Sequence, residues 1–165
     1  VEIIPNGIYT DEFKKINKIK YKDYIKKNIT LNIKNTDKII VSMGRLQKKK
    51  GFDILIDSFK EVLKIYPNSY LFIAGPDQGE QINLENKIKN LKLEGRVYLV
   101  GSIENQKKIE FLGNADMFVL PSHNENFGNV YLESLAAGTP IIASFETPWS
   151  VVEKYNCGKW IKTTK

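Results

Sequence analysis

The fold is decided by residues 38–74, which read KIIVSMGRLQKKKGFDILIDSFKEVLKIYPNSYLFIA. This stretch begins and ends with short apolar runs, at 38–43 and 70–74, that are rich in β-branched or aromatic residues. Between them, residues 52–66 place apolar side chains at helical spacing. Strands that are apolar throughout and are joined by a helix are typical of a parallel sheet that is covered on both faces.

The same alternation continues to the end of the chain. We expect further strands at 97–100, 117–120, 140–143 and 159–161, and further helices at 80–91, 105–112, 129–137 and 151–155. Right-handed crossovers between parallel strands then give an α/β fold, a Rossmann-like doubly wound parallel sheet. Residues 11–38 are rich in lysine with weakly periodic Ile and Tyr, which favours a helix or a helix and a loop.

The composition is that of one globular domain with an uneven charge. The 165 residues are 42% hydrophobic and 27% charged, and they contain no apolar run long enough to span a membrane. Residues 1–60 hold 14 Lys and Arg against 7 Asp and Glu, whereas residues 61–165 hold 11 against 12. Such a basic region attracts phosphorylated ligands or anionic lipid, or it is a solvated lysine face.

Three further features of the sequence limit the partners, the compartment and the bound groups that we expect. Aromatic residues do not alternate with the basic ones, so we do not expect a nucleic-acid partner. The single cysteine, Cys157, cannot form an internal disulfide, which fits a reducing compartment. His, Cys and carboxylates show no metal-ligand spacing, so the sequence predicts no bound metal and no cofactor.

Ligands of doubly wound sheets bind beyond the carboxyl ends of the strands. The residues expected there are Gly44-Arg45, Gly75-Pro76, Gly101-Ser102, Pro121-Ser122-His123 and Ser144-Phe145. In the first loop, GRLQKKKG at 44–51, Gly44 permits close approach of a ligand and Arg45 suits a phosphate. A basic surface loop is the alternative. The loop has neither the Walker order nor G-x-G-x-x-G, which counts against a dinucleotide cofactor.

The second candidate loop is PSHNENFGNVYLE, at 121–133. Glu133 has apolar neighbours and therefore needs a partner, and a ribose diol would be one. Glu125 precedes the predicted helix, where an acid can also serve as a simple cap. Backbone N–H groups at the helix start suit a phosphate or sugar oxygen, and they belong to Phe127, Gly128 and Asn129. The lone histidine, His123, either contacts a ligand or is a structural or exposed residue.

These segments, in this order, resemble the C-terminal, donor-binding domain of GT-B glycosyltransferases of family 4 (glycosyl transferases group 1). The resemblance is carried by Pro5–Ile8, Gly44-Arg45, Lys50-Gly51, Phe72–Gly75, Pro121-Ser122, the E-x(7)-E pair Glu125 and Glu133, Glu133–Pro140, Thr147–Trp149 and Cys157-Gly158. E-x(7)-E alone is a weak pattern, but the ordered set is specific and covers nearly the whole chain. The expected fold is then the C-terminal half of a GT-B enzyme, with residues 1–165 as one donor-binding domain.

The resemblance also implies roles for single residues. Arg45 and Lys50, beside Gly44, would hold the donor diphosphate, and Lys50 is chosen among three consecutive lysines because it directly precedes the glycine at 51. Glu133 would bind the ribose hydroxyls, and Glu125 would face the donor sugar as the catalytic residue. The remaining implied donor-binding residues are Ser102 and Ile103 at the base, Phe127, Gly128 and Asn129 at the sugar and distal phosphate, and His123.

For the whole protein, the resemblance implies a retaining glycosyltransferase that uses a nucleotide-sugar donor and no metal. The acceptor would be a glycan or a lipid-linked sugar in cell-surface polysaccharide or glycolipid synthesis. We expect a cytoplasmic protein that associates peripherally with the inner face of the membrane. The N-terminal acceptor domain is not among these residues, so we expect them to bind donor without transfer. The alternatives are a GT-B-like epimerase or phosphorylase domain and a nucleotide-binding or interaction module without catalysis.

Overall fold

The computed structural model describes residues 6–15 and 33–163. Within these residues, parallel strands form one six-stranded sheet in the order β3-β2-β1-β4-β5-β6. The strands are β1 (Lys38–Met43), β2 (Ser69–Ala74), β3 (Val97–Leu99), β4 (Met117–Leu120), β5 (Ile141–Ser144) and β6 (Gly158–Ile161). The order of the strands reverses between β1 and β4, as in Rossmann-type sheets. The predicted doubly wound sheet is therefore confirmed.

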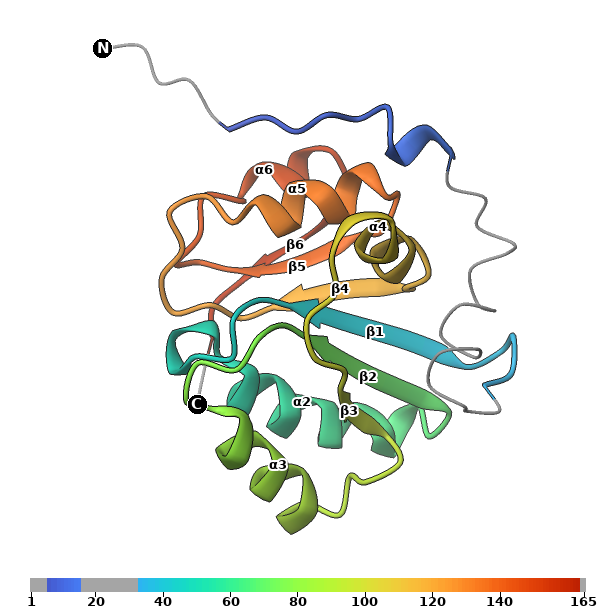
Figure 1. The fold of residues 1–165 in the computed structure, drawn as a ribbon, viewed down its shortest axis with the longest axis vertical. Helices are drawn as coiled ribbons and strands as arrows, with labels where there is room; N and C mark the ends of the chain where they lie inside the picture. Colours follow the sequence, from blue (N-terminus) through green and yellow to red (C-terminus); the bar gives the residue numbers. More distant parts are fainter. Residues whose placement is uncertain (1–5, 16–32, 164–165) are drawn as a thin grey trace.

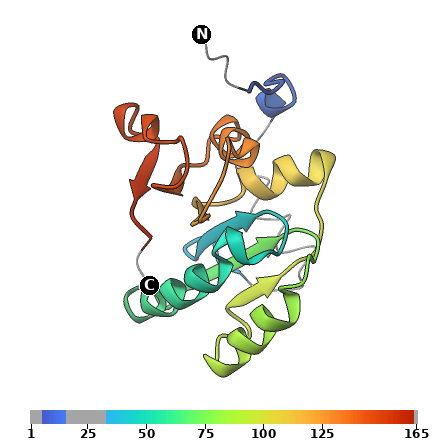
Figure 2. The ribbon, with the colours of Figure 1, turned by 90° about the vertical axis from the view of Figure 1, so that its left-hand side faces the viewer.

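Helices cover both faces of this sheet. They are α2 (Phe52–Ile65), α3 (Gln81–Asn90), α4 (Asn105–Gly113), α5 (Asn129–Ala136) and α6 (Val151–Lys154), with 3-10 turns η1 (Phe13–Lys15) and η2 (Lys48–Lys50). Helices α2 and α3 lie on one side, and α4, α5 and α6 lie on the other (Figures 1 and 2). Right-handed crossovers require this division, because the chain moves outward from β1 to β3 and outward in the opposite direction from β4 to β6.

The N-terminal segment packs on the helices of the second face. Residues 6–15 run across α4 and α5 (Figure 1), and Asn6 Nδ2 donates to Asn129 Oδ1 at 3.1 Å. Phe13, in η1, is 9% exposed and belongs to the main core. The helix, or helix and loop, expected over 11–38 falls mostly on residues 16–32, which lie outside the described residues.

The core fixes the sheet and the helix after its central strand. The larger apolar strand residues with no exposed surface are Ile39, Val41, Leu71, Phe72, Phe118 and Leu120. Helix α2 buries the apolar stripe read from the sequence, namely Phe52, Leu55, Ile56 and Phe59. Each such side chain contributes about 1.5–3 kcal/mol when it leaves water. The loops at the carboxyl edge are consequently held by rigid elements.

One glycine brings two of these loops together. Gly51 lies between η2 and α2 with a φ of 69°, in the left-handed region. A Cβ on this residue would lie 2.2 Å from the carbonyl oxygen of Pro121, which follows β4. Position 51 therefore requires glycine for two reasons: the left-handed backbone conformation and the close approach of the Pro121 carbonyl.

We expect Gly51→Ala to lower the free energy of unfolding by about 2–5 kcal/mol, since left-handed strain and an overpacked contact add. Gly79→Ala is the matched control, because Gly79 also has a positive φ, 96°, but no atom lies within 4 Å of its added Cβ. That variant should lose only about 1–2 kcal/mol. Denaturant unfolding of both variants measures the difference, and equal losses would show that the contact with Pro121 does not constrain the fold.

Candidate functional site

The loops that follow the strands meet at one edge of the sheet, as predicted. The loops after β1, β2 and β3 are joined by backbone hydrogen bonds: Gly44 N–H donates to Ala74 O at 2.9 Å, and Gly75 N–H donates to Gly101 O at 2.8 Å. The loop after β4 joins its neighbour through Ser144 Oγ, which donates to Ser122 O at 2.5 Å. The candidate residues therefore occupy a continuous edge.

Two of the predicted site residues form an ion pair at this edge. Lys50 Nζ donates to Glu125 Oε2, and the two side chains are 11% and 17% exposed. Lys50 ends the turn after β1, and Glu125 lies in the loop after β4. The pair therefore spans the point where the strand order reverses, which is where doubly wound sheets bind their ligands.

The three consecutive lysines of this loop differ in their surroundings. Lys48 is 70% exposed and pairs with Asp53 at 2.9 Å, and this hydrogen bond and charge raise the pKa of Lys48. Lys49 is exposed, and its backbone carbonyl accepts from the His123 N–H at 2.8 Å. Of the three, Lys50 is the buried one. Arg45, earlier in the same loop, is exposed at the sheet edge and leaves its guanidinium accessible.

The loop that carries Glu125 is held by aromatic residues. Trp149 Nε1 donates to the Phe127 carbonyl at 2.6 Å, and the Trp149 ring lies 5.2 Å from the Phe127 ring and 5.6 Å from the Tyr131 ring. Tyr131 donates its hydroxyl proton to Leu120 O at 2.7 Å, and burial raises the pKa of this hydroxyl, which keeps the proton in place. The start of α5 is thus fixed against the end of β4.

Gly128 completes this turn as the residue before α5. Its φ is 75°, and a Cβ there would lie 2.7 Å from the Tyr131 ring and 2.9 Å from Glu125 Cγ. The chain can therefore pass between these two side chains only at a glycine. The N–H groups at the start of α5 are those of Asn129 and Val130, ahead of the first backbone bond, from Tyr131 N–H to Gly128 O. A helix start of this kind favours an anion.

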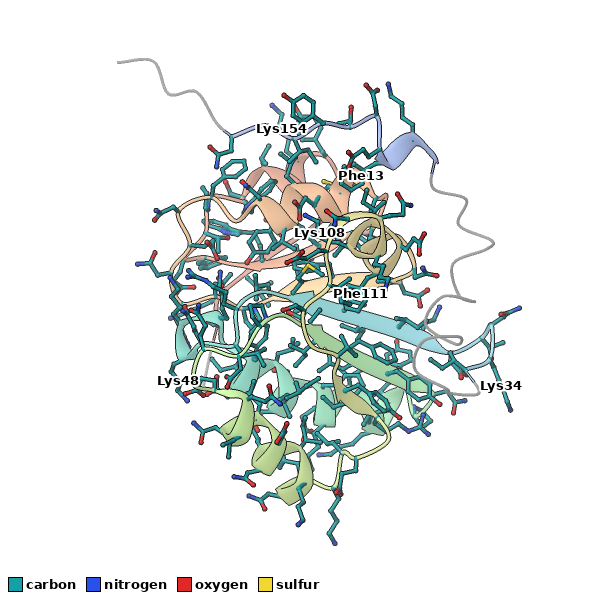
Figure 3. The ribbon with its side chains drawn as sticks, in the orientation of Figure 1. Phe13, Lys34, Lys48, Lys108, Phe111 and Lys154 are labelled. Carbon is teal, nitrogen blue, oxygen red and sulfur yellow. The ribbon has the colours of Figure 1, made fainter. Side chains whose placement is uncertain are left out.

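Glu133 has the partner that its apolar setting demands. Lys108 Nζ, from α4, lies 2.6 Å from Glu133 Oε1, and the side chains are 29% and 17% exposed. Figure 3 labels Lys108 at α4, the helix that packs beside α5. Sequence reasoning missed Lys108 because the two residues belong to different helices. The signal available was the topology, which places α4 and α5 on the same face of the sheet.

Two of the predicted site residues, Glu133 and His123, line different hollows. Glu133 and Lys108 line a hollow of about 300 Å³ with residues 7–9, 12–13, 105 and 109. Ser102 and Ile103 lie in the loop between β3 and α4 that leads into it, with Ser102 exposed and Ile103 packed against the core. His123 is exposed and lines a different hollow, with Lys48 and Asp53. Contact between His123 and a ligand stays a prediction.

The geometry combines the exposed Arg45, the mostly buried Lys50–Glu125 pair, the start of α5 and a second acid, Glu133. Such a set can hold an anionic ligand that also carries hydroxyl groups. In residues 6–15 and 33–163, no group of three or more His, Cys, Asp or Glu could hold a metal ion. Among the same residues, no helix has both the length and the apolarity needed to cross a membrane.

Comparison with known proteins gives a consistent set of matches. The family model described as "Glycosyl transferases group 1" matches residues 23–165. Alpha-monoglucosyldiacylglycerol synthase of Streptococcus pneumoniae is 32% identical over 142 residues, which is 86% of this chain and 32% of that protein. The O-antigen biosynthesis glycosyltransferase WclY of Escherichia coli is also 32% identical, over 86% of this chain and 36% of its own. This chain thus spans about a third of these curated relatives.

Solved structures agree on the fold. WaaG, described as a glycosyltransferase involved in lipopolysaccharide biosynthesis, superimposes with a TM-score of 0.80 and 25% identity, over 98% of this chain and 42% of its own. Anabaena Alr3699/HepE, solved in complex with UDP-glucose, has a TM-score of 0.81 and 23% identity, over 98% of this chain and 43% of its own. Both likenesses extend over the whole sheet.

We expect the Lys50–Glu125 pair to show strong coupling in a double-mutant cycle. Lys50→Met and Glu125→Gln should each cost about 1–3 kcal/mol of unfolding free energy, because each leaves a mostly buried group without its partner. The double variant should cost less than the sum by about 0.5–3 kcal/mol. The control is the exposed pair Lys64–Glu61, both 64% exposed, whose coupling should stay below about 0.5 kcal/mol. Additive losses at Lys50 and Glu125 would contradict the pairing.

Proposed function

Because the chain belongs to the glycosyl transferases group 1 family, we propose that it binds the nucleotide-sugar donor of a retaining glycosyltransferase. Its relatives are glycosyltransferases of glycolipid, O-antigen and lipopolysaccharide synthesis. The observation that carries the proposal is the Lys50–Glu125 pair at the switch point, beside the exposed Arg45. In this arrangement Lys50 places a cation at the point where the strand order reverses, which is where doubly wound sheets bind their ligands.

The diphosphate is proposed to bind between Arg45 and Lys50. Arg45 can grip phosphate oxygens in a bidentate manner, and Lys50 supplies a compact charge. Lys50 pairs with Glu125. A phosphate oxygen can replace that carboxylate as the partner of Lys50. The exchange frees Glu125 to face the donor sugar, where the sugar gains positive charge as the leaving group departs.

The nucleoside and the sugar account for the other candidate residues. Glu133 accepts the ribose hydroxyls, and Ser102 and Ile103 border the base. The N–H groups of Phe127, Gly128 and Asn129 meet the sugar and the distal phosphate, with support from the Trp149 anchor on the Phe127 carbonyl. Of the proposed donor-binding residues, His123 has the weakest support, because it lines a different hollow from Glu133.

The proposed chemistry needs stabilisation of a departing diphosphate. Arg45, Lys50 and the start of α5 place positive charge where negative charge develops, the role that a metal fills in other enzymes. The acceptor, a glycan or a lipid-linked sugar, would bind to another part of a longer protein at the cytoplasmic face of a membrane. The alternative functions for the same fold and residues are an epimerase domain and a nucleotide-binding module without catalysis.

Titration calorimetry with nucleoside diphosphates and their sugar conjugates tests this function. Saturable binding of one nucleoside diphosphate, with affinity that depends on the attached sugar, supports the proposal. Binding that is indifferent to every attached sugar favours the module without catalysis. If the chain binds none of these ligands, the proposed function is wrong.

We expect Arg45→Ala to weaken binding of a nucleoside diphosphate about 10–100-fold, since charge-assisted hydrogen bonds to phosphate contribute about 1.5–3 kcal/mol. The matching nucleoside monophosphate should lose much less. Lys49→Ala is the control, because it removes the same charge from an exposed position in the same loop. Calorimetry on UDP and UMP, or GDP and GMP, gives the comparison. Equal losses for both members of a pair would remove Arg45 from the diphosphate site.

We expect the chain to bind donor without transferring sugar at enzymatic rates. Holding both reactants in an attack geometry supplies up to about 7–11 kcal/mol of the barrier, and a donor site alone cannot position an acceptor hydroxyl. Release of diphosphate from the preferred nucleotide sugar, with candidate acceptors present, is the measurement. Transfer at ordinary rates would mean that the acceptor site lies within these residues.

A further inference from the structure

We propose that Lys108 is a positioning residue for Glu133, and that its ammonium group holds the carboxylate in the orientation that accepts the two ribose hydroxyls. The inference rests on the proposed function, because Glu133 binds ribose only there. It adds a residue from α4 to a site whose other members lie in the loops after the strands or in α5. Lys108 would set the selectivity of the site for ribose over deoxyribose.

The contact has the geometry of a charge-assisted hydrogen bond. Lys108 Nζ lies 2.6 Å from Glu133 Oε1, slightly closer than the usual distance of about 2.7–2.9 Å in N⁺–H···O⁻ bonds. Lys108 lies in the first turn of α4, where its N–H donates to Glu104 O at 3.3 Å. Both side chains are mostly covered, at 29% and 17% exposed, whereas the surface pair Lys64–Glu61 is 64% exposed at both ends. Solvent therefore competes less for the Lys108 contact.

The pair leaves the carboxylate able to bind a diol. A carboxylate has two oxygens and about four lone-pair sites, and Lys108 takes one site on Oε1. Oε2 and the second site of Oε1 remain for hydroxyl donors. Lysine is a donor only, so it cannot accept from a hydroxyl itself. Lys108 thus fixes the plane of the carboxylate while Glu133 keeps the accepting role.

The surroundings direct this carboxylate toward a ligand-sized space. Glu133 and Lys108 line one hollow of about 300 Å³, at the lower end of the usual range of ligand pockets, about 300–1,000 Å³. Asn105, at the start of α4, lines the same hollow, and the loop with Ser102 and Ile103 leads directly to it. A nucleoside whose base lies along that loop would bring its ribose to this pair.

A purely structural tie between α4 and α5 is the competing explanation, and selectivity for the sugar separates the two. The experiment uses UDP and 2′-deoxy-UDP, or GDP and 2′-deoxy-GDP if the guanine nucleotide binds better. Wild type should prefer the ribonucleotide about tenfold, the equivalent of one well-placed hydrogen bond. In Lys108→Met, affinity for the ribonucleotide should fall about tenfold while affinity for the deoxynucleotide changes little, so that the preference is lost.

Three further variants sharpen the test. Lys107→Met, at an exposed position next to Lys108 on the same helix, should keep the preference. Lys108→Arg retains a cation and should therefore keep part of the preference for the ribonucleotide. If Lys108→Met does not fold, Lys108→Arg takes its place in the comparison. Adding Lys108→Met to Glu133→Gln should change the affinity no further, because Lys108 acts through Glu133.

The outcomes distinguish failure of this inference from failure of the proposed function. If Lys108→Met weakens both nucleotides equally, or lowers the melting temperature with the ribose preference intact, Lys108 is a structural tie and the inference is wrong. If wild type binds both sugars equally, Glu133 does not read the ribose and the inference is again wrong. If wild type binds no nucleoside diphosphate, the proposed function falls and the inference falls with it.

Discussion

The candidate site depends on one place where two backbone segments touch. The Pro121 carbonyl lies where a side chain at position 51 would begin, so the turn after β1 can reach the loop after β4 only because residue 51 is glycine. Lys50 directly precedes this contact, and Glu125 lies in the loop that begins at Pro121. The ion pair that spans the switch point is therefore a consequence of packing between backbones.

The two acids of the E-x(7)-E pair, Glu125 and Glu133, are both held by a lysine. Each meets a lysine from a neighbouring element: Glu125 meets Lys50 of η2, and Glu133 meets Lys108 of α4. A mostly covered carboxylate without a cation would be costly, and pairing with a lysine offsets part of that cost. They also tie the two acids to η2 and to α4, which are distant in the sequence from the loop and helix that carry the acids. The spacing in the sequence is local, but the charge balance of the site is formed by contacts between elements.

The sequence predicted the fold closely because its signals are local. Each described strand and helix from β1 onward lies within one residue of its expected bounds, as the apolar runs at 38–43 and the stripe in 52–66 illustrate. The edge that gathers the candidate residues followed from the parallel order of the strands. Lys108 could not be found in this way, because its partner lies on another helix and no spacing within α4 marks it. The separate hollow of His123 depends on the path of a loop, which the sequence pattern does not specify.

The Trp149 anchor gives the molecule an intrinsic optical probe. The chain has two tryptophans. The Trp149 indole donates to the Phe127 carbonyl and packs against the Phe127 ring, whereas the Trp160 indole donates to the Thr147 carbonyl. Indole emission responds to its hydrogen bond and to nearby rings, so a movement of residues 125–128 changes the fluorescence of Trp149. Any ligand that displaces this loop would therefore change the emission of Trp149 without an added label.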